Sequence, residues 1–190
     1  MGDFLKKCAV FCLLLLVLSG CSAAPDEMEA GLQLRSRLLQ AAECTFSTSI
    51  TADYGDQLHT FSMDCRADKH GDLGFTVTAP DTISGIQGQL SGEGGKLTFA
   101  DTALYFELLA EDQLSPVSAP WILVRTLRSG YITSACREEE TIRLSVEDSF
   151  EEDSLRLDIW LNTGGMPEHA DILYGGRRIL SVDVENFQIL

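Results

Sequence analysis

Apolar and polar residues alternate along most of this chain, a period of two that is typical of β-strands with one buried face. The alternation is regular at residues 73–79, 142–146 and 155–161. Clusters of glycine, aspartate and asparagine separate the alternating runs and predict the turns between them. The pattern therefore predicts a sheet of about 10–11 antiparallel strands, interrupted by two stretches with a helical period.

The first helical stretch is predicted at about residues 27–42. Asp26 and Glu29 stand three positions apart, as the polar residues of a capping box do, and mark its start. Apolar residues then fall along one side of the helix. They are Met28, Leu32, Leu38, Leu39 and Ala42.

The second helical stretch begins at Ser115–Pro116 or Ala119–Pro120, because proline suits the first position of a helix, and it ends at Gly130. Trp121 and Val124 belong to an apolar stripe, which neighbouring residues widen over much of the helix surface. Such a helix is expected to lie against the sheet or to cover a cavity.

The hairpin around residues 53–56 allows a prediction about two cysteines. If Ile50 pairs with His59, then Cys44 lies opposite Cys65 on the same face. Directly opposed residues lie near the Cα separation that a disulfide needs, so a Cys44–Cys65 disulfide is predicted. The alternatives are two packed free thiols, or a bond from either cysteine to Cys136.

The last hairpin turns at Gly175–Gly176. A two-residue loop would bring polar residues opposite apolar ones, whereas a three-residue loop sets Ile172 against Leu180 and keeps one face apolar. The second pairing is therefore predicted. Apolar residues change parity near the end of the chain, which predicts a β-bulge near Asn186.

The amino terminus carries a different pattern, in which two lysines precede ten apolar residues at 9–18. Ten residues are too few to cross a bilayer, which needs roughly 20, so residues 1–20 are predicted to be a signal peptide. The quartet Leu18-Ser19-Gly20-Cys21 resembles a bacterial lipobox. That resemblance implies cleavage before Cys21, diacylglycerol on its sulfur and acylation of the new amino terminus. The alternative is an ordinary secreted protein with a chance cysteine at the cleavage site.

Residues 21–26 then form a lipidated tether, and residues 27–190 form a single domain. The chain has 14 Lys+Arg against 29 Asp+Glu, a formal net charge of −15. This charge argues against nucleic acid as a partner and against electrostatic adsorption to anionic lipid, so attachment must come from the acyl chains. The expected location is extracytoplasmic, anchored to the bacterial cell membrane or to the outer membrane if the cell has one.

Few residues are arranged for catalysis. His59, His70 and His169 are far apart, and none stands at metal-ligand spacing from a second histidine or a cysteine. No enzymatic activity, no metal and no cofactor other than the acyl chains on Cys21 are expected. A hydrolase with an unrecognised carboxylate pair is an alternative. Arg125 and Arg128 are predicted to pair with neighbouring carboxylates, or else to bind a lipid headgroup.

The order of elements resembles the LolA-like family, the outer-membrane lipoprotein-sorting proteins and their lipid-anchored relatives. Two segments are similar to clostridial lipoproteins of this type. One is residues 75–86, with Pro80 and Ser84-Gly85, and the other is the run Leu-x-Phe-x-x-x-x-Leu-Tyr-Phe at 97–106. The resemblance covers nearly all of residues 27–190. It implies an α+β fold in which a strongly curved antiparallel sheet, an open and unclosed β-barrel, wraps the N-terminal and the inserted helix.

Carrier members of that family move acyl chains, so the resemblance implies an apolar ligand cavity between sheet and helices. The expected function is non-enzymatic: a lipid-anchored envelope protein that binds a lipid or a lipoprotein acyl chain. The alternative is an interaction module with a filled core that docks an envelope protein partner. The residues expected to line the cavity are Phe75, Val77, Phe99, Phe106, Trp121 and Val124.

Overall fold

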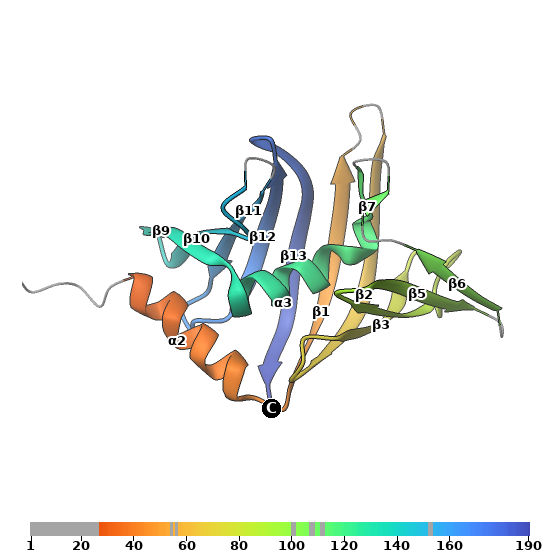
Figure 1. Cartoon of the computed structure of the whole chain (residues 1–190), viewed down its shortest axis with the longest axis horizontal. Helices are drawn as coiled ribbons and strands as arrows, with labels where there is room; N and C mark the ends of the chain where they lie inside the picture. Colours follow the sequence, from red (N-terminus) through yellow and green to blue (C-terminus); the bar gives the residue numbers. More distant parts are fainter. Residues whose placement is uncertain are drawn as a thin grey trace, which may run out of the picture.

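The computed structural model describes residues 27–53, 55, 57–99, 102–106, 109–110, 113–151 and 154–190. Within this part, helices α2 (Glu27–Gln40) and α3 (Ala119–Ser129) lie on one side of a large antiparallel sheet (Figure 1). The 3₁₀ turn η1 (Pro116–Ser118) leads directly into α3, and Gly130 caps its end. Both helices therefore occupy the predicted places, whereas the signal peptide, Cys21 and the tether lie outside the described residues.

Eleven strands of the described chain form the main sheet, in the order β6-β5-β4-β3-β2-β1-β13-β12-β11-β10-β9. Strands β6 and β9 are its two edges and do not pair with each other, so the sheet stays open. The bounds are β1 Glu43–Asp53, β2 Leu58–Asp68, β3 Leu73–Ala79, β4 Gln87–Ser91, β5 Gly94–Phe99, β6 Thr102–Phe106, β9 Tyr131–Glu138, β10 Thr141–Glu147, β11 Leu155–Leu161, β12 Pro167–Tyr174 and β13 Arg177–Ile189. A separate ribbon pairs β7 (Leu109–Ala110) with β8 (Gln113–Leu114).

The sheet is strongly curved, because β3–β6 run nearly crosswise to β1 and β13 in Figure 1. Helix α3 crosses the sheet in front of β13 and β1, while α2 packs against β9 and β10. The expected α+β architecture, an open curved sheet around two helices, is confirmed. We call the helix side of the sheet its inner face, the other side its outer face, and strands β4–β6 the wing.

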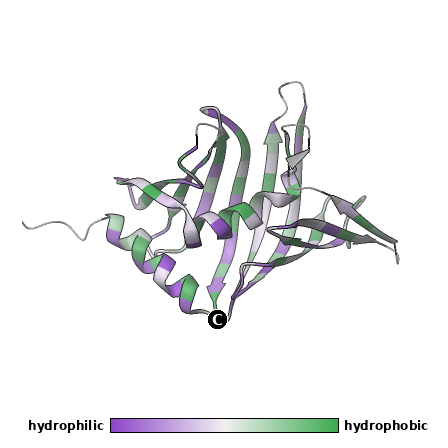
Figure 2. Ribbon diagram, in the orientation of Figure 1, coloured by the Kyte–Doolittle hydropathy of each residue, from purple (hydrophilic) through white to green (hydrophobic). Residues whose placement is uncertain are grey.

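Strict alternation places the core on the inner face. In β1 every second residue from Cys44 to Ala52 is buried, and β3 buries Leu73, Phe75 and Val77 in the same way. Figure 2 shows the alternation as hydrophobic and hydrophilic bands along the strands. Eight of the eleven residues of α3 are buried, as expected for a helix that is apolar over most of its surface and packs on a sheet.

The register predicted for the first hairpin is wrong by two residues, since Ile50 pairs with Phe61 rather than with His59. The reason is the length of the connection: β1 ends at Asp53 and β2 begins at Leu58, whereas a pairing of Ile50 with His59 would leave only two residues between the strands. The Asp53 carboxylate accepts a hydrogen bond from the Gly55 amide at 2.8 Å, and Gly55 has a φ of +86° that favours glycine. A shift of two keeps every side chain on its face, so the core assignment is unaffected.

The same shift separates the two cysteines expected to form a disulfide. Cys44 lies opposite Ala67 and Cys65 opposite Phe46, and both are buried free thiols. Diagonal neighbours of this kind lie about 7–8 Å apart, too far for a disulfide, so that prediction is wrong. Burial raises the pKa of the Cys44 thiol to about 11 and also raises the pKa of Cys65.

The last hairpin has the predicted pairing but not the predicted loop. Ile172 pairs with Leu180, yet the loop contains only Gly175–Gly176, and Ile179 is the extra residue of a bulge that restores the register. The bulge predicted near Asn186 is confirmed: the pairing with β1 skips there, and Asn186 has a φ of +55°.

Gly88 faces inward beneath the ring of Phe75, with which it pairs across β3 and β4. A Cβ atom at position 88 would lie 2.2 Å from the Cζ atom of Phe75, whereas a Cβ at Gly74 on the outer face would find no atom nearer than 3.9 Å. Glycine at position 88 is therefore required by packing against a buried ring.

We expect Gly88→Ala to lower the free energy of unfolding by about 1–3 kcal/mol, because the Phe75 ring must move within a packed core. Gly74→Ala is the matched control and should change it by no more than about 0.5 kcal/mol. Urea denaturation followed by circular dichroism measures both. Equal effects of the two substitutions would contradict the packing explanation.

Candidate functional site

The structure does not gather the six expected lining residues around one cavity. Phe75, Val77, Trp121 and Val124 are only 0–4 % exposed and belong to the continuous core. Phe99 instead lies on the wing and is 56 % exposed. The side chain of Phe106 lies outside the described residues.

An exposed apolar surface continues the core onto the wing. Leu97 pairs with Gly88 on one side and with Leu104 on the other, so all three share the inner face with Phe75. Leu97 is half-buried, whereas Phe99 and Leu104 are 56 % and 61 % exposed. We call Leu97, Phe99 and Leu104 the apolar ledge. At the apolar ledge, apolar side chains of the inner face are exposed to solvent.

A hollow of about 310 Å³ lies beside the C-terminal half of α3 and is bordered by Leu39, His70, Trp121 and two arginines. Arg125 lies over the Trp121 ring, 5.1 Å from its centroid. Arg128 donates to the backbone carbonyl of Leu38, at 3.2 Å near the end of α2, and to those of Asp68 and Lys69 at the end of β2. Among the described residues it has no carboxylate partner, so the predicted pairing of Arg128 with carboxylates is wrong, because backbone carbonyls of two elements occupy its guanidinium group.

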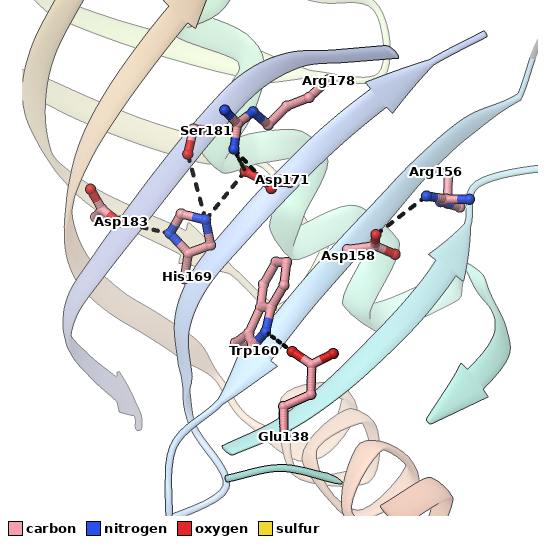
Figure 3. A network of polar contacts seen from close by, with 9 residues as sticks. All are labelled: Glu138, Arg156, Asp158, Trp160, His169, Asp171, Arg178, Ser181 and Asp183. Atoms are coloured by element: carbon pink, nitrogen blue, oxygen red, sulfur yellow. Dashed lines mark hydrogen bonds and ion pairs between the residues drawn. The ribbon is translucent and has the colours of Figure 1, made fainter. Parts of the chain in front are cut away.

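A second group of polar residues lies on the outer face of β12 and β13 (Figure 3). His169 Nδ1 is 2.7 Å from the carboxylate of Asp183, and His169 Nε2 is 3.2 Å from that of Asp171. The Ser181 hydroxyl lies 3.5 Å from the same Nε2 atom, and Arg178 donates to Asp171 at 3.3 Å. Sequence reasoning treated His169 alone and missed this cluster, although the correctly predicted hairpin register places His169 opposite Asp183.

Ser181, His169 and Asp183 are the residue types of a catalytic triad, but their geometry differs from that of a triad. His169 Nε2 lies 3.2 Å from the Asp171 carboxylate and 3.5 Å from the Ser181 hydroxyl, so the nearer partner of this nitrogen is a carboxylate and not the serine. Backbone N–H groups in the middle of paired strands already donate hydrogen bonds to the neighbouring strands, so they do not form an oxyanion hole. The arrangement therefore does not have the geometry of a catalytic triad, because the serine is not the nearest partner of the histidine and the strand amides do not form an oxyanion hole.

The wider network on this face is held by aromatic and charged side chains. The Trp160 ring stands edge-on to His169 with 5.2 Å between centroids, and its Nε1 atom donates to Glu138 at 2.9 Å. Arg143 forms an ion pair with the same Glu138 at 3.1 Å. These contacts link the side chains of β9, β10, β11 and β12 across the outer face.

Two further properties bear on the site. In the part of the chain that the structure describes, no group of three or more histidine, cysteine, aspartate or glutamate residues is placed to hold a metal ion. None of the described helices is both long enough and apolar enough to span a membrane.

Comparisons with known proteins identify the architecture. No protein-family model matches the sequence, and no curated protein matches it. Among solved structures, a LolA-superfamily protein from Nitrosomonas europaea has a TM-score of 0.50 and 8% identity, over 88% of this chain and 94% of that chain.

Two further solved structures are similar at lower TM-scores. A putative outer membrane lipoprotein-sorting protein domain from Vibrio parahaemolyticus gives 0.45 at 8% identity, over 85% of this chain and 91% of that chain. The lipoprotein LppX from Mycobacterium tuberculosis gives 0.40 at 11% identity, over 85% and 92%. At such identities a likeness shows the fold alone. The described residues form an open eleven-stranded sheet around helices α2 and α3, and with the similarity to the Nitrosomonas protein this shows that the chain has the LolA-like fold.

Proposed function

We propose that this protein is a non-enzymatic, membrane-anchored envelope lipoprotein that binds a lipid or a lipoprotein acyl chain. The LolA-like fold and the lipobox-like quartet ending in Cys21 support the proposal. The observation that carries it is the apolar ledge, where Phe99 and Leu104 are more than half exposed beside a buried core. Exposed apolar surface that continues a core is a binding surface for an apolar partner.

The ledge, and not the space beneath α3, is the proposed ligand site. Phe75 and Val77 are buried at 4 % and 3 % exposure, so the inner face is filled up to the wing. An acyl chain lying along Leu97, Phe99 and Leu104 would remove these side chains from water, at roughly 0.8 kcal/mol for each methylene group buried. The ligand would then lie at the open edge of the sheet, where it enters and leaves without unfolding the core.

Aspartate in place of Leu104 is expected to weaken fatty-acid binding at least tenfold, since a carboxylate would be buried beneath the acyl chain. The measurement is fluorescence titration of an unlipidated chain, beginning at Ser22, with a fluorescently labelled sixteen-carbon fatty acid. The matched control is Thr98→Asp, which adds the same charge on the opposite face of β5 and should change the affinity less than twofold. Equal losses for Leu104→Asp and Thr98→Asp would place the ligand elsewhere.

Docking of an envelope protein partner is a second candidate function, favoured by the filled interior around Trp121 and Val124. Native mass spectrometry of the gently purified, unlipidated chain separates the two functions. Retained lipid at near-stoichiometric amounts supports lipid binding. A clean mass of the protein alone, together with no affinity for the fatty acid, supports docking.

A further inference from the structure

The outer face of the sheet carries two adjoining hollows, of about 690 Å³ and 960 Å³. Four residues border both of them, namely Arg66, Gly74, Gln89 and Lys96. The hollows therefore form one continuous depression, which we call the outer groove. It lies on the face opposite the helices, separated from the apolar ledge by the thickness of the sheet.

Neutral side chains with free hydrogen-bonding groups line much of the groove. Gln87 and Gln89 of β4 and Gln188 of β13 point to the outer face, and none of their carboxamides has a hydrogen-bond partner among the described residues. Each carboxamide offers donors and an acceptor together, and the hydroxyl of Thr76 between them does the same. This set is complementary to a ligand whose own groups both donate and accept, as hydroxyl and acetamido groups do.

The backbone shapes the groove at two positions. Gly74 leaves its floor without a side chain, and a Cβ atom there would meet only the carbonyl oxygen of Arg66, at 3.9 Å. Asn186 is the residue with a φ of +55° at the bulge of β13, and it borders the same hollow. A bulge changes the direction in which a side chain points, and a non-glycine residue such as Asn186 rarely has a positive φ. The backbone at Asn186 is therefore an unusual feature of the groove. The groove is thus built mainly on strand positions, whose backbone is fixed by the pairing of the sheet.

The charges of the groove select against an anionic ligand. Asp64, Asp68, Asp72 and Glu93 border it, against two cations, Arg66 and Lys96. Arg66 is already engaged in an ion pair with Glu43 on β1. An anionic polymer would therefore meet an excess of carboxylates, whereas carboxylates and carboxamides both accept hydrogen bonds from sugar hydroxyls.

An aromatic ring completes the second hollow. Tyr105 on the outer face of β6 is 73 % exposed, and the ammonium group of Lys96 lies 5.8 Å from its ring centroid. A flat apolar ring beside polar side chains is an amphipathic surface, on which the CH face of a sugar ring packs while its hydroxyls are hydrogen-bonded. Each hollow falls in the size range of a small-molecule pocket, so the two together accommodate several sugar units.

From these observations we propose that the outer groove binds a neutral polysaccharide chain. The polymer lies across β3, β4 and β5 over Gly74, with its hydroxyl and amide groups bonded to the carboxamides and one sugar ring against Tyr105. Bound in this way, it leaves the apolar ledge on the inner face free. The protein would then hold an apolar ligand and an envelope glycan on opposite faces of one wing.

Gly74→Leu tests the proposal, because the new side chain fills the groove where no atom stands in its way. The probes are hexasaccharides of N-acetylglucosamine and of glucose, with hexagalacturonate as the anionic comparison. Isothermal titration calorimetry is carried out on the full-length protein in detergent micelles. We expect at least one neutral hexasaccharide to bind, and Gly74→Leu to weaken that binding at least tenfold.

The matched control is Thr78→Leu, which adds the same side chain to the outer face of β3 beyond the groove and should change affinity less than twofold. Circular dichroism checks that both variants fold. If Gly74→Leu does not fold, the double substitution Gln87→Ala with Gln89→Ala is expected to weaken binding at least threefold. Failure of both neutral sugars to bind, tighter binding of hexagalacturonate, or binding unchanged in the folded groove variants would overturn the proposal.

Discussion

Replacing Cys21 by alanine is expected to abolish the incorporation of labelled fatty acid into this protein. The proposed anchor is a thioether on the Cys21 sulfur, and alanine has no atom that can form it. Cells grown with an alkyne-bearing palmitate report the result as the labelled band after coupling to a fluorophore. The original chain should label strongly, and Cys21→Ala should label no more than background.

Loss of the acyl chains is also expected to release the domain from the membrane. One acyl chain gives only marginal attachment and two or more give stable attachment, while a chain with a net charge of −15 is not held to anionic lipid by its charge. Replacing residues 1–21 by a cleavable secretory signal peptide should therefore move the protein from the membrane pellet to the soluble fraction. Ser22→Ala is the control and should keep both label and attachment. Labelling of Cys21→Ala at the original level would refute the anchor.

The wing of the sheet takes part in both binding proposals. Its inner face carries the apolar ledge, and its outer face forms one side of the outer groove, which continues over β3 and β2. Residues one position apart face opposite sides: Leu97 and Phe99 face inward, and Lys96 and Thr98 face outward. A β-strand makes this possible because consecutive side chains point to opposite faces. The remainder of the sheet, beneath α2 and α3, supplies the core that holds the wing.

Local pattern predicted the fold well, for a physical reason. A period of two fixes which side chains face inward, and this assignment survives even where the pairing itself is wrong, as at Ile50 and Phe61. The pairing of Ile172 with Leu180 was predicted because the register of a two-residue loop sets polar residues opposite apolar ones, whereas this pairing keeps one face apolar. Asn186 was predicted as a bulge because apolar residues change parity there.

The candidate site was harder to predict, because exposure depends on which elements cover a face. Val77 and Phe99 both belong to alternating apolar runs, yet Val77 is 3 % exposed within the core and Phe99 is 56 % exposed on the wing. The Cys44–Cys65 disulfide was predicted wrongly because the loop of the first hairpin is longer than expected. The longer loop shifts the register by two residues and separates the two cysteines. The outer groove depends on the absence of a side chain at Gly74 and on the curvature of the sheet, and neither has a sequence signature of its own.

Sequence reasoning also missed the way in which the two helices are joined. Arg35 of α2 donates from Nε to the carbonyl of Leu127 at 2.8 Å and from Nη2 to the carbonyl of Gly130 at 2.7 Å, at the end of α3. Arg128 of α3 donates to the carbonyl of Leu38, near the end of α2. Each helix thus satisfies carbonyl groups that the last turn of the other leaves without a partner.

Arg35→Met is therefore expected to lower the free energy of unfolding by about 3 kcal/mol. It removes two hydrogen bonds from a charged donor, each worth roughly 1.5–3 kcal/mol, and leaves part-buried carbonyls of Leu127 and Gly130 unpaired. Methionine retains most of the apolar length of the side chain, so the loss reports the bonds and not a cavity. Urea denaturation of the unlipidated chain gives the value.

Arg37→Met is the matched control, because Arg37 lies on the exposed side of the same helix and should cost no more than about 0.5 kcal/mol. Arg128→Met is expected to destabilise as well. Since the two arginines fasten the same pair of helices, the double variant should lose less than the sum of the single losses. Equal losses for Arg35→Met and Arg37→Met would show that α2 and α3 are held together by apolar packing alone. Strict additivity would show that the two arginines act independently and contradict the shared role.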